Sequence, residues 1–387
     1  MTKRYPSRVL PEVLSSVDVA IIGGGVIGCS IAYHATRRGA RVALLEAEYV
    51  GSGASGATAG MLVAQAEAHE PGPFLDLLLL SRELHKPLGE ELHELTGLDP
   101  EYVWSGTLQV ATDTESRDIY SAKYSWQKEQ ELTAQWLDVD EARKLEPNIS
   151  PESIAALYLS EDGQVNPPRL VRALALGATV GGAKIMEATR VSGFVVEGQR
   201  VRGLKTTRGM ISAATVVLAG GALSALLSDE LGIHLPVFPV KGELLAVNAR
   251  PVPIKANIYN SHCYVVPKRD GRVIIGATEE PGVYDRRPTL GSVASLSRAA
   301  VELIPSLSHA LFTSAWGGLR SGTPDGRPML GSLEGWEGLL IATGHYRNGV
   351  LLSAVTGEII AALALGEPPL ADISPFLHQR FVRNTAQ

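Results

Sequence analysis

The stretch DVAIIGGGVIG at residues 18–28 constrains the fold of this chain more than any other part of its sequence. Its first five residues are mostly apolar and rich in β-branched side chains, as expected for a strand buried on both faces. Between this strand and an expected helix lie three glycines at the spacing G-x-G-x-x-G, namely Gly23, Gly25 and Gly28. The first permits a tight turn, the second lets a pyrophosphate approach the backbone, and the third allows the helix to pack closely on the strand. The pyrophosphate would then meet the N–H groups at the helix N-terminus.

An acidic residue stands where such a unit binds ribose. Val42–Leu45 is a second apolar strand, and Glu46 follows it, 23 residues after Gly23. A carboxylate there can accept hydrogen bonds from both ribose hydroxyls, and it would repel a 2′-phosphate. A purely structural glycine turn is the alternative, but the strand, the helix and the acid together favour an adenine dinucleotide. The motif alone leaves NAD and FAD equally open.

Bulk composition limits the class of protein. A chain of 387 residues is too long for one compact core, so two domains are expected. The net charge of −6 and the lack of a Lys/Arg run argue against nucleic acid as a partner. No apolar stretch approaches the roughly 18 residues of a membrane-spanning helix, and the first 16 residues lack the apolar core of a signal peptide. We therefore expect a mobile tail over residues 1–16 of a cytoplasmic protein without a membrane segment.

Neither cysteine nor histidine is arranged for metal binding. Cys29 and Cys263 are the only cysteines, and no C-x-x-C occurs, so we expect neither a disulfide nor a thiolate metal site. The nine histidines include no H-x-H or H-E-x-x-H pattern. His85 and His93 lie eight residues apart on the polar face of an expected helix, where solvated side chains are expected.

The segment after Glu46 is unusually rich in small residues. Gly51–Leu62 reads GSGASGATAGML. A flexible loop is one interpretation, although a linker would be more polar, and the composition favours backbone donors pressed against a ligand. Thr215–Leu218 is a further apolar strand that also ends in glycines. It indicates a second backbone contact with the same ligand.

The pattern changes twice along the rest of the chain. Pro73–Thr96 predicts a long helix with leucines on one face. From Pro236 to Gly318 alternating segments and a hairpin turn at 268–271 predict an antiparallel sheet. An apolar strand at 338–342 and an apolar helix at 350–365 then return to the first pattern. We predict an α/β fold with a discontinuous Rossmann-like domain over residues 17–90, 150–228 and 318–387, and an inserted α+β substrate domain, built on an antiparallel sheet, over residues 91–149 and 229–317.

Seven motifs in this order resemble those of a known family. They read GGGVIG…LLE, GSGASGATAGM, VVLAGGA, VKGELL, CYVVP…GATEEPG, GGLRSGTPDGRPMLG and GHYRNGVLL, and they run from about residue 17 to 365. The sequence resembles the D-amino-acid oxidase superfamily of FAD enzymes and is most similar within it to the glycine oxidases linked to the thiazole moiety of thiamin. The resemblance makes FAD the expected dinucleotide.

The resemblance also implies roles for individual residues. Besides the three glycines of the motif, the cofactor-binding residues would be Val26, Ile27, Glu46, Ala47, Ala54, Ser55, Ala59, Gly60, Met61, Val191, Gly220, His345, Tyr346, Arg347, Asn348, Gly349, Val350 and Leu351. The substrate carboxylate would be held by Tyr264, Arg320 and Arg347. Sarcosine oxidases of the superfamily carry a flavin-linking cysteine a few residues before a T-P-D step. Here GGLRSG precedes that step, so the FAD is expected to be bound non-covalently.

Physical reasoning supports part of this set. Arg320 closes an otherwise apolar β-run, and Arg347 lies in a glycine-flanked turn. Two guanidiniums without an obvious acidic partner call for a ligand carboxylate. The alternative is that each arginine pairs with a local acid, such as Asp325 or Glu358, or reaches solvent.

Tyr264 and His345 each have two interpretations. Tyr264 faces one side of its strand and Cys263 the other, so Tyr264 either contacts the substrate or is a sheet tyrosine with a solvated hydroxyl. His345 is either a neighbour of the flavin ring or a hydrogen-bonded core histidine, and we do not expect it to act as a base. The helix expected to start near Gly349 would direct its N-terminal dipole toward a reduced, anionic flavin.

The resemblance implies FAD-dependent oxidative deamination of glycine and other small amines, such as sarcosine and small D-amino acids. A hydride would pass from the substrate to the flavin, the imine would hydrolyse to a 2-oxo acid and ammonia, and O₂ would reoxidise the flavin to give H₂O₂. No acid–base residue and no metal are required, and the product would feed thiamin thiazole synthesis. A homo-oligomer, such as a tetramer, is expected. The alternatives are a D-amino-acid or sarcosine oxidase or dehydrogenase, and a flavoprotein electron-transfer subunit of a complex.

Overall fold

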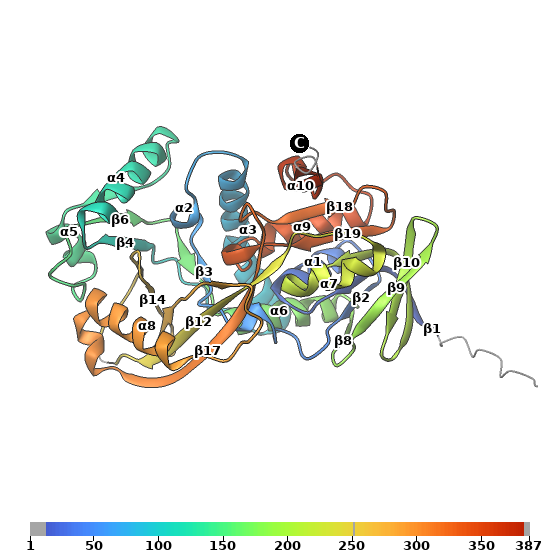
Figure 1. Ribbon diagram of the computed structural model, residues 1–387, viewed down its shortest axis with the longest axis horizontal. Coiled ribbons are helices and arrows are strands. Elements are labelled where there is room, and N and C mark those ends of the chain that lie inside the picture. Colours follow the sequence, from blue (N-terminus) through green and yellow to red (C-terminus); the bar gives the residue numbers. More distant parts are fainter. Residues whose placement is uncertain (1–12, 251, 383–387) are drawn as a thin grey trace, which may run out of the picture.

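Two large β-sheets organise the chain, one in each lobe of the molecule (Figure 1). The computed structural model describes residues 13–250 and 252–382. In the first sheet five neighbouring strands are parallel, namely β19 (Leu339–Thr343), β11 (Gly209–Leu218), β1 (Val13–Ile22), β2 (Val42–Leu45) and β8 (Lys184–Met186). Three antiparallel strands extend it, namely β18 (Met329–Ser332) beside β19, β10 (Arg200–Thr206) beside β11, and β9 (Val191–Glu197) beside β10.

Helices enclose the main hydrophobic core on one face of this sheet. They are α1 (Val26–Arg37), α3 (Pro73–Thr96), α6 (Pro167–Val180) and α9 (Ser353–Ala364). Each contributes fully buried aliphatic side chains, for example Ile31, Leu78, Leu174 and Ile360. A second core lies on the other side, where β9 and β10 pack with the short helices α7 (Ser224–Ser228) and α10 (Gln379–Val382). The strands of the first sheet are thus buried on both faces, which explains their nearly continuous apolar sequences.

The second sheet is almost entirely antiparallel. Its strands run in the order β16 (Glu280–Pro281), β12 (Phe238–Asn248), β15 (Arg272–Gly276), β14 (Tyr264–Pro267), β13 (Asn257–Tyr259), β4 (Thr107–Ala111), β6 (Ala155–Leu159) and β5 (Gln135–Leu137). The long strand β17 (Leu311–Gly322) also pairs with β12, and only β13 and β4 are parallel. Three helices pack around this sheet, namely α4 (Thr114–Glu129), α5 (Val139–Leu145) and α8 (Leu290–Leu303).

Short elements join the two sheets. The small-residue segment leads into β3 (Met61–Leu62), which pairs with β7 (Gly163–Gln164), and then into α2 (Ala64–Glu67). Single 3₁₀ turns occur at Ala54–Gly56, Gly221–Leu223, Asp229–Leu231, Pro305–His309, Tyr346–Asn348 and Ser374–Phe376. Two of these turns, Ala54–Gly56 and Tyr346–Asn348, lie at the candidate site described below.

The predicted α/β class is confirmed, with local corrections. Strand β1 begins at Val13, so residues 13–16 belong to a strand paired with β11 and not to a tail, while residues 1–12 lie outside the described residues. The helix expected over 350–365 begins only at Ser353. The division into two domains remains a proposal. Within it, the sequence analysis places Ala155–Leu159 in the first domain, whereas the structure pairs this strand with β4 and β5 of the second sheet.

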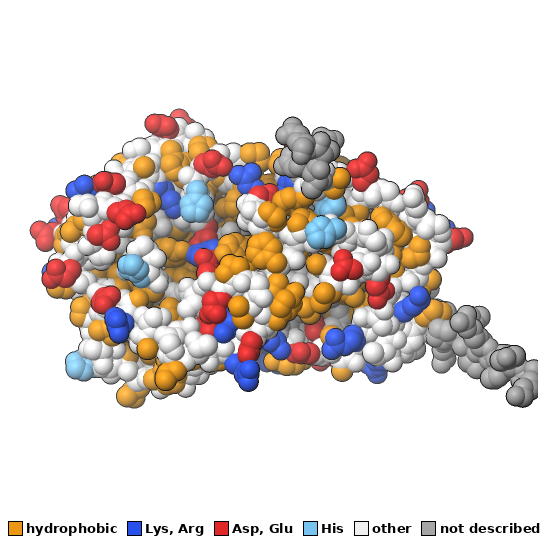
Figure 2. Space-filling model, viewed as in Figure 1, with side chains coloured by type: hydrophobic (Ala, Val, Ile, Leu, Met, Phe, Trp, Pro, Cys, Tyr) orange, Lys and Arg blue, Asp and Glu red, His pale blue; other side chains and the backbone are white. Residues whose placement is uncertain are grey.

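The distribution of surface charge and the hydropathy of the helices can be compared with the composition of the chain. Acidic and basic side chains are interspersed over the face drawn in Figure 2, as expected for a moderate net charge. Within residues 13–250 and 252–382, the helices are too short or too polar to cross a bilayer.

Candidate functional site

A groove lies where the carboxyl ends of β1, β2 and β11 meet. Parallel strands end at the same edge of a sheet, which is where ligands of such folds bind. Gly23 follows β1 with φ +108°, a left-handed conformation that favours glycine. A Cβ on Gly28 would lie 1.9 Å from the Gly23 carbonyl oxygen, so glycine is required for this close approach of α1. We call this hollow the cofactor groove, and its walls include the predicted residues Gly23, Gly25, Val26, Ile27, Glu46, Ala47, Ala54, Ser55, Gly220, His345, Tyr346 and Gly349.

Glu46 is fixed at the groove by backbone donors. One carboxylate oxygen accepts a hydrogen bond from the Gly24 N–H at 2.7 Å, and the other accepts one from the Glu48 N–H at 2.9 Å. The second oxygen also accepts from the Ser52 hydroxyl at 3.5 Å. Each carboxylate oxygen has two acceptor sites, so the first oxygen can still accept a ribose hydroxyl. Glu46 therefore lies where the sequence predicted a ribose-binding acid.

The small-residue segment packs over the start of α1. Ser55 Oγ accepts a hydrogen bond from the Val26 N–H at 2.9 Å, one of the helix N-terminal groups without an intrahelical acceptor. Farther along, the Ala59 carbonyl accepts a hydrogen bond from Lys268 Nζ at 2.5 Å. These contacts support the interpretation of a ligand-facing loop over that of a linker.

Some residues predicted to contact the cofactor lie beside or behind the groove. Met61, Arg347, Asn348 and Val350 line an adjacent pocket instead. Val191 packs in the second core, and its neighbour Arg190 lines the groove. The others, Gly28, Ala59, Gly60 and Leu351, are outside both linings and support the walls from behind. Contact of these residues with the cofactor stays a prediction.

The adjacent pocket, which we call the substrate pocket, lies between the groove and the second sheet. The two hollows share Val26, Ala54, Ser55, Tyr346 and Gly349. Apolar side chains of the pocket are Met61, Val63 and Leu244, and polar ones include Glu67, Tyr264, Arg320 and Arg347. A molecule in this pocket would therefore touch a ligand that extends along the groove.

Arg320 is the unpaired cation of the substrate pocket. Its Nη1 donates a hydrogen bond to the Thr278 carbonyl at 3.0 Å, and no carboxylate of residues 13–250 or 252–382 forms an ion pair with it. Gly242 on β12 makes room for it, because a Cβ there would lie 2.2 Å from Arg320 Nη1. The guanidinium thus lies flat on the sheet, with donors free for an anion.

Tyr264 lies next to Arg320 on the same sheet. Its ring covers Gly276, where a Cβ would come within 2.6 Å of the ring. The side chain is buried, and burial raises the pKa of its hydroxyl. Cys263 packs in the core on the opposite face, so the predicted alternation of this strand is confirmed. The structure favours the substrate-side interpretation over a solvated hydroxyl.

Arg347 lines the pocket, but the expectation that it lacks an acidic partner is wrong. Its Nε and Nη2 donate to the two oxygens of Glu67 at 2.9 and 2.8 Å, and its Nη1 donates to Glu279 at 3.2 Å. Its guanidinium also contacts the Tyr259 hydroxyl. The charge of Glu67 raises the pKa of Arg347. The acids named in the sequence analysis have other partners: Asp325 pairs with Arg380, and Glu358 with His34 and Arg38.

Glu67 and Glu279 are the site residues that sequence reasoning missed. Glu67 ends α2, and its side chain is only 10% exposed. Burial alone would raise the pKa of Glu67, but the Arg347 charge outweighs it and holds that pKa below its usual range. Glu279 accepts a hydrogen bond from the Tyr346 hydroxyl at 2.5 Å. Glu67 is 280 residues from Arg347 in sequence, so only the fold shows the pair.

His345 is a buried histidine at the wall of the groove. Its Nε2 lies 3.1 Å from Thr356 Oγ1, and burial lowers its pKa to about 3. It is therefore neutral at physiological pH, and both sequence interpretations hold in part, since the ring lines the groove and is hydrogen-bonded in the core.

The burial of His345 predicts a loss of stability in mild acid. The unfolded chain takes up a proton on this residue near pH 6.5, whereas the folded chain resists protonation until about pH 3. The free energy of unfolding should thus fall by about 1.4 kcal/mol per pH unit below 6.5 from this residue alone. Urea unfolding between pH 7.5 and 5.0 should show a shallower pH dependence for His345→Gln than for the wild type. The exposed His93→Gln variant should follow the wild type, and equal slopes for all three proteins would contradict the prediction.

The groove and pocket together fit an adenine dinucleotide with a ring system at the pocket end. Glycines would form its pyrophosphate cradle, the fixed Glu46 carboxylate would face its ribose, and small residues let the segment around Ala54–Gly56 pack closely on β17. Gly318 on β17 is one of these, since a Cβ there would come within 2.7 Å of the Ala57 side chain.

Comparison with known proteins also indicates an adenine dinucleotide, namely FAD. The family model DAO, FAD dependent oxidoreductase, matches residues 18–363. Glycine oxidase of Geobacillus kaustophilus is 41% identical over 368 residues, which cover 94% of this chain and 97% of that protein. A crystal structure of glycine oxidase from G. kaustophilus superposes with a TM-score of 0.91 over 94% of this chain and 99% of that chain.

Two further relatives carry other names. Hydrogen cyanide synthase subunit HcnC of Pseudomonas protegens is 35% identical over 406 residues, covering 95% of this chain and 97% of that protein. The Bifunctional protein ThiO/ThiG of Synechocystis is 34% identical over 375 residues, covering 95% of this chain but 54% of that protein.

Proposed function

This chain belongs to the DAO family of FAD-dependent oxidoreductases, and we propose that the protein oxidises glycine and other small amines with O₂ as the final electron acceptor. The FAD cofactor and the class of FAD-dependent amine oxidase follow from the family and its glycine oxidase members. The observation that carries the substrate proposal is the unpaired Arg320 beside Tyr264, in a pocket that adjoins the cofactor groove.

The chain would hold FAD without a covalent bond. Cys29 and Cys263 are both buried, and neither lines the groove or the pocket. Burial raises the pKa of the Cys263 thiol to about 12, so it stays protonated and poorly nucleophilic. Acid precipitation of the purified yellow protein should therefore leave all flavin absorbance in the supernatant. Colour that stays with the precipitated chain would contradict non-covalent binding.

The substrate would bind by its carboxylate. Arg320 can donate charge-assisted hydrogen bonds, and the Tyr264 hydroxyl can donate another. Arg347 is less suited to this role, because Glu67 and Glu279 already neutralise its charge. We therefore assign the carboxylate to Arg320 and Tyr264, and a supporting role to Arg347.

Charge balance also limits the substrate class. Arg320 and Arg347 both line the pocket, but Arg347 is already paired with Glu67 and Glu279, so among the described residues the pocket offers one free guanidinium for one substrate carboxylate. Met61, Val63 and Leu244 form the apolar wall, which favours amines with a small or no side chain. Glycine and sarcosine meet both conditions.

The residues of this chain position the reactants. When FAD is bound, it would accept the electrons that the amine loses. Arg320 and Tyr264 hold the substrate from the second sheet, and the groove holds the cofactor on the first, so the contact between the sheets sets the distance between the reactants. No residue of the pocket needs to act as a base if the amine binds in its neutral form.

Substitution of Gly242 tests whether the position of the Arg320 guanidinium matters, with little change to the fold. In Gly242→Ala the new methyl group would overlap the guanidinium, the flexible end of a long side chain, which can shift. We expect the KM for glycine to rise roughly tenfold, while FAD content and thermal stability stay near wild type. Steady-state kinetics and the ratio of flavin to protein absorbance provide the measurements. An unchanged KM would show that the position of Arg320 does not affect substrate binding.

Peroxide release across a panel of amines tests the proposed function. The panel contains glycine, sarcosine, N-ethylglycine, D-alanine, D-proline and iminodiacetate, and ammonia is measured in parallel. We expect H₂O₂ with glycine and sarcosine and little with iminodiacetate, which has two carboxylates. A preference for D-alanine or D-proline would indicate a D-amino-acid oxidase. Reduction of an artificial acceptor without H₂O₂ would instead favour a dehydrogenase or a subunit of a complex, as the name of the HcnC relative implies for that protein.

We further propose that the imine product feeds thiamin thiazole synthesis. The name of the ThiO/ThiG relative supports this link, since one chain there combines a region similar to this protein with a second part. Thiamin dependence of a strain that lacks this gene would test the proposal. A homo-oligomeric state also remains a prediction.

A further inference from the structure

We propose that His85 is a positioning residue of the cofactor site, because its imidazole anchors the backbone of Val350 and Leu351 and thereby fixes the turn that faces the flavin. The proposal depends on FAD binding and on no particular amine substrate. It also corrects an expectation, since the sequence analysis placed His85 on a solvated helix face and the side chain is in fact fully buried.

Both ring nitrogens of His85 have defined partners. Nε2 lies 2.8 Å from the Leu351 carbonyl oxygen and 3.1 Å from that of Val350, and Nδ1 lies 2.8 Å from the Tyr102 hydroxyl. A carbonyl only accepts, so Nε2 carries the proton and donates it, while Nδ1 accepts from Tyr102. Burial lowers the pKa of His85 to about 4, so this neutral tautomer persists at physiological pH. The ring is thus a fixed link between α3 and two consecutive carbonyls.

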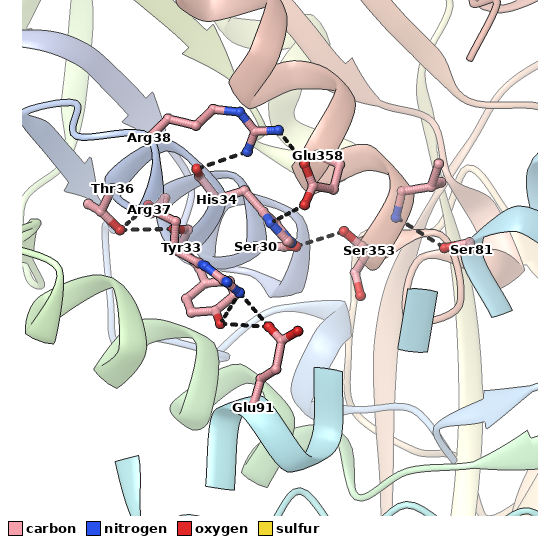
Figure 3. A network of polar contacts seen from close by, with 12 residues as sticks. Ser30, Tyr33, His34, Thr36, Arg37, Arg38, Ser81, Glu91, Ser353 and Glu358 are labelled. Atoms are coloured by element: carbon pink, nitrogen blue, oxygen red, sulfur yellow. Dashed lines mark hydrogen bonds and ion pairs between the residues drawn. The ribbon is translucent and has the colours of Figure 1, made fainter. Parts of the chain in front are cut away.

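Two serines anchor the same segment from neighbouring helices (Figure 3). Ser81, one turn before His85 on α3, donates to the Leu351 carbonyl at 2.5 Å and accepts from the Val355 N–H at 3.2 Å. Ser30 on α1 donates to the Ser353 carbonyl at 2.7 Å. The start of α9 is therefore held by its backbone, from two helices that also build the core of the cofactor domain.

The anchored segment is the one that meets the ligand. Tyr346 and Gly349 line both the groove and the pocket, and Val350 lines the pocket. In a trans peptide the N–H points away from the carbonyl, so an anchored Val350 carbonyl also fixes the direction of the Leu351 N–H. His85 lines neither the groove nor the pocket, so it can position the turn without touching the ligand.

The inference predicts that FAD affinity depends on a donor at the Nε2 position. An apolar side chain of similar size, His85→Leu, would remove the bonds that tie the Val350 and Leu351 carbonyls to the ring, and leave these carbonyls with the donors of Ser353 and Ser81. We expect its dissociation constant for FAD to rise about tenfold, measured by quenching of flavin fluorescence as apoprotein is titrated. In His85→Gln the amide nitrogen can take the place of Nε2, so most of the affinity should return. The control His93→Leu changes an exposed histidine of the same helix and should bind FAD as the wild type does.

A second pair of variants keeps the test decisive if His85→Leu fails to fold. The shorter amide of His85→Asn replaces Nδ1 and does not reach the carbonyls, so it should bind FAD several-fold more weakly than His85→Gln. Its bound flavin should also show an altered absorption spectrum. Equal FAD affinity and spectra for the Asn and Gln variants, or a folded His85→Leu protein with wild-type affinity, would overturn the proposal. Because no amine is present, failure here would leave the proposed oxidation of glycine untouched.

Discussion

Replacement of Arg320 by alanine should raise the KM for glycine by 10- to 100-fold. Arg320 is the pocket cation that pairs with no carboxylate in the described part of the chain, so its loss should remove charge-assisted hydrogen bonds to the substrate. Such bonds contribute about 1.5–3 kcal/mol, which is roughly a 13- to 160-fold change in kcat/KM and of the same order as the expected change in KM. FAD content should be unchanged, because Leu319 and Ser321 line the cofactor groove and Arg320 does not. The measurements are peroxide release against glycine concentration and the flavin-to-protein ratio.

A matched control separates this effect from a general loss of positive charge. Arg287 is 88% exposed, and its one ion-pair partner within residues 13–250 and 252–382 is the nearby Asp285, so Arg287→Ala should keep the wild-type KM. If Arg320→Ala also keeps the wild-type KM, Arg320 does not bind the substrate. In that case Arg347 would have to release Glu67 to bind the carboxylate, and the assignment made here would be wrong.

Replacement of Gly28 by alanine should abolish FAD binding and strongly destabilise the fold. The new Cβ would lie 1.9 Å from the Gly23 carbonyl oxygen, which is a backbone atom and cannot turn away as a side chain can. Relief requires α1 to move off β1, which opens the pyrophosphate cradle. Overpacking of this kind costs about 1–3 kcal/mol or more. We expect colourless protein with a thermal midpoint several degrees below that of the wild type.

The control for this variant is another helical glycine. A Cβ on Gly291, in α8, would meet no atom within 4 Å. Gly291→Ala should therefore keep its full flavin content and gain about 0.5–1 kcal/mol of stability, because alanine favours the helix. A yellow Gly28→Ala protein with a wild-type melting point would show that the close approach of α1 is not needed for FAD binding.

Much of the cofactor site could be predicted from the sequence because its determinants are local. The glycine spacing, the two buried strands and Glu46 lie within 30 residues, and each acts through backbone conformation or through short contacts such as Gly24 to Glu46. The strand with Tyr264 also follows local alternation, which places Cys263 in the opposite core. Local patterns of this kind can be recognised from the sequence without knowledge of the tertiary fold.

The errors concern residues whose partners are distant in the sequence. Arg347 seemed to have no acidic partner because Glu67 and Glu279 lie 280 and 68 residues away. His85 seemed exposed because its helix is polar nearby, yet it contacts carbonyls 265 and 266 residues farther along. Charge pairing and burial depend on which segments the fold brings together, and no local pattern encodes that.

The sequence by itself indicated an adenine dinucleotide and predicted where it would bind, since Gly23, Gly25, Gly28 and Glu46 act within one βαβ unit. Only the tertiary structure decided which pocket arginine pairs with a carboxylate of the described residues. It brings Arg347 onto Glu67 of α2 and leaves Arg320 over Gly242, where no carboxylate among the residues described by the structure pairs with it. The physical reason is that a guanidinium binds a ligand anion only where no protein carboxylate already occupies it, and that condition is set by the packing of the two sheets against each other.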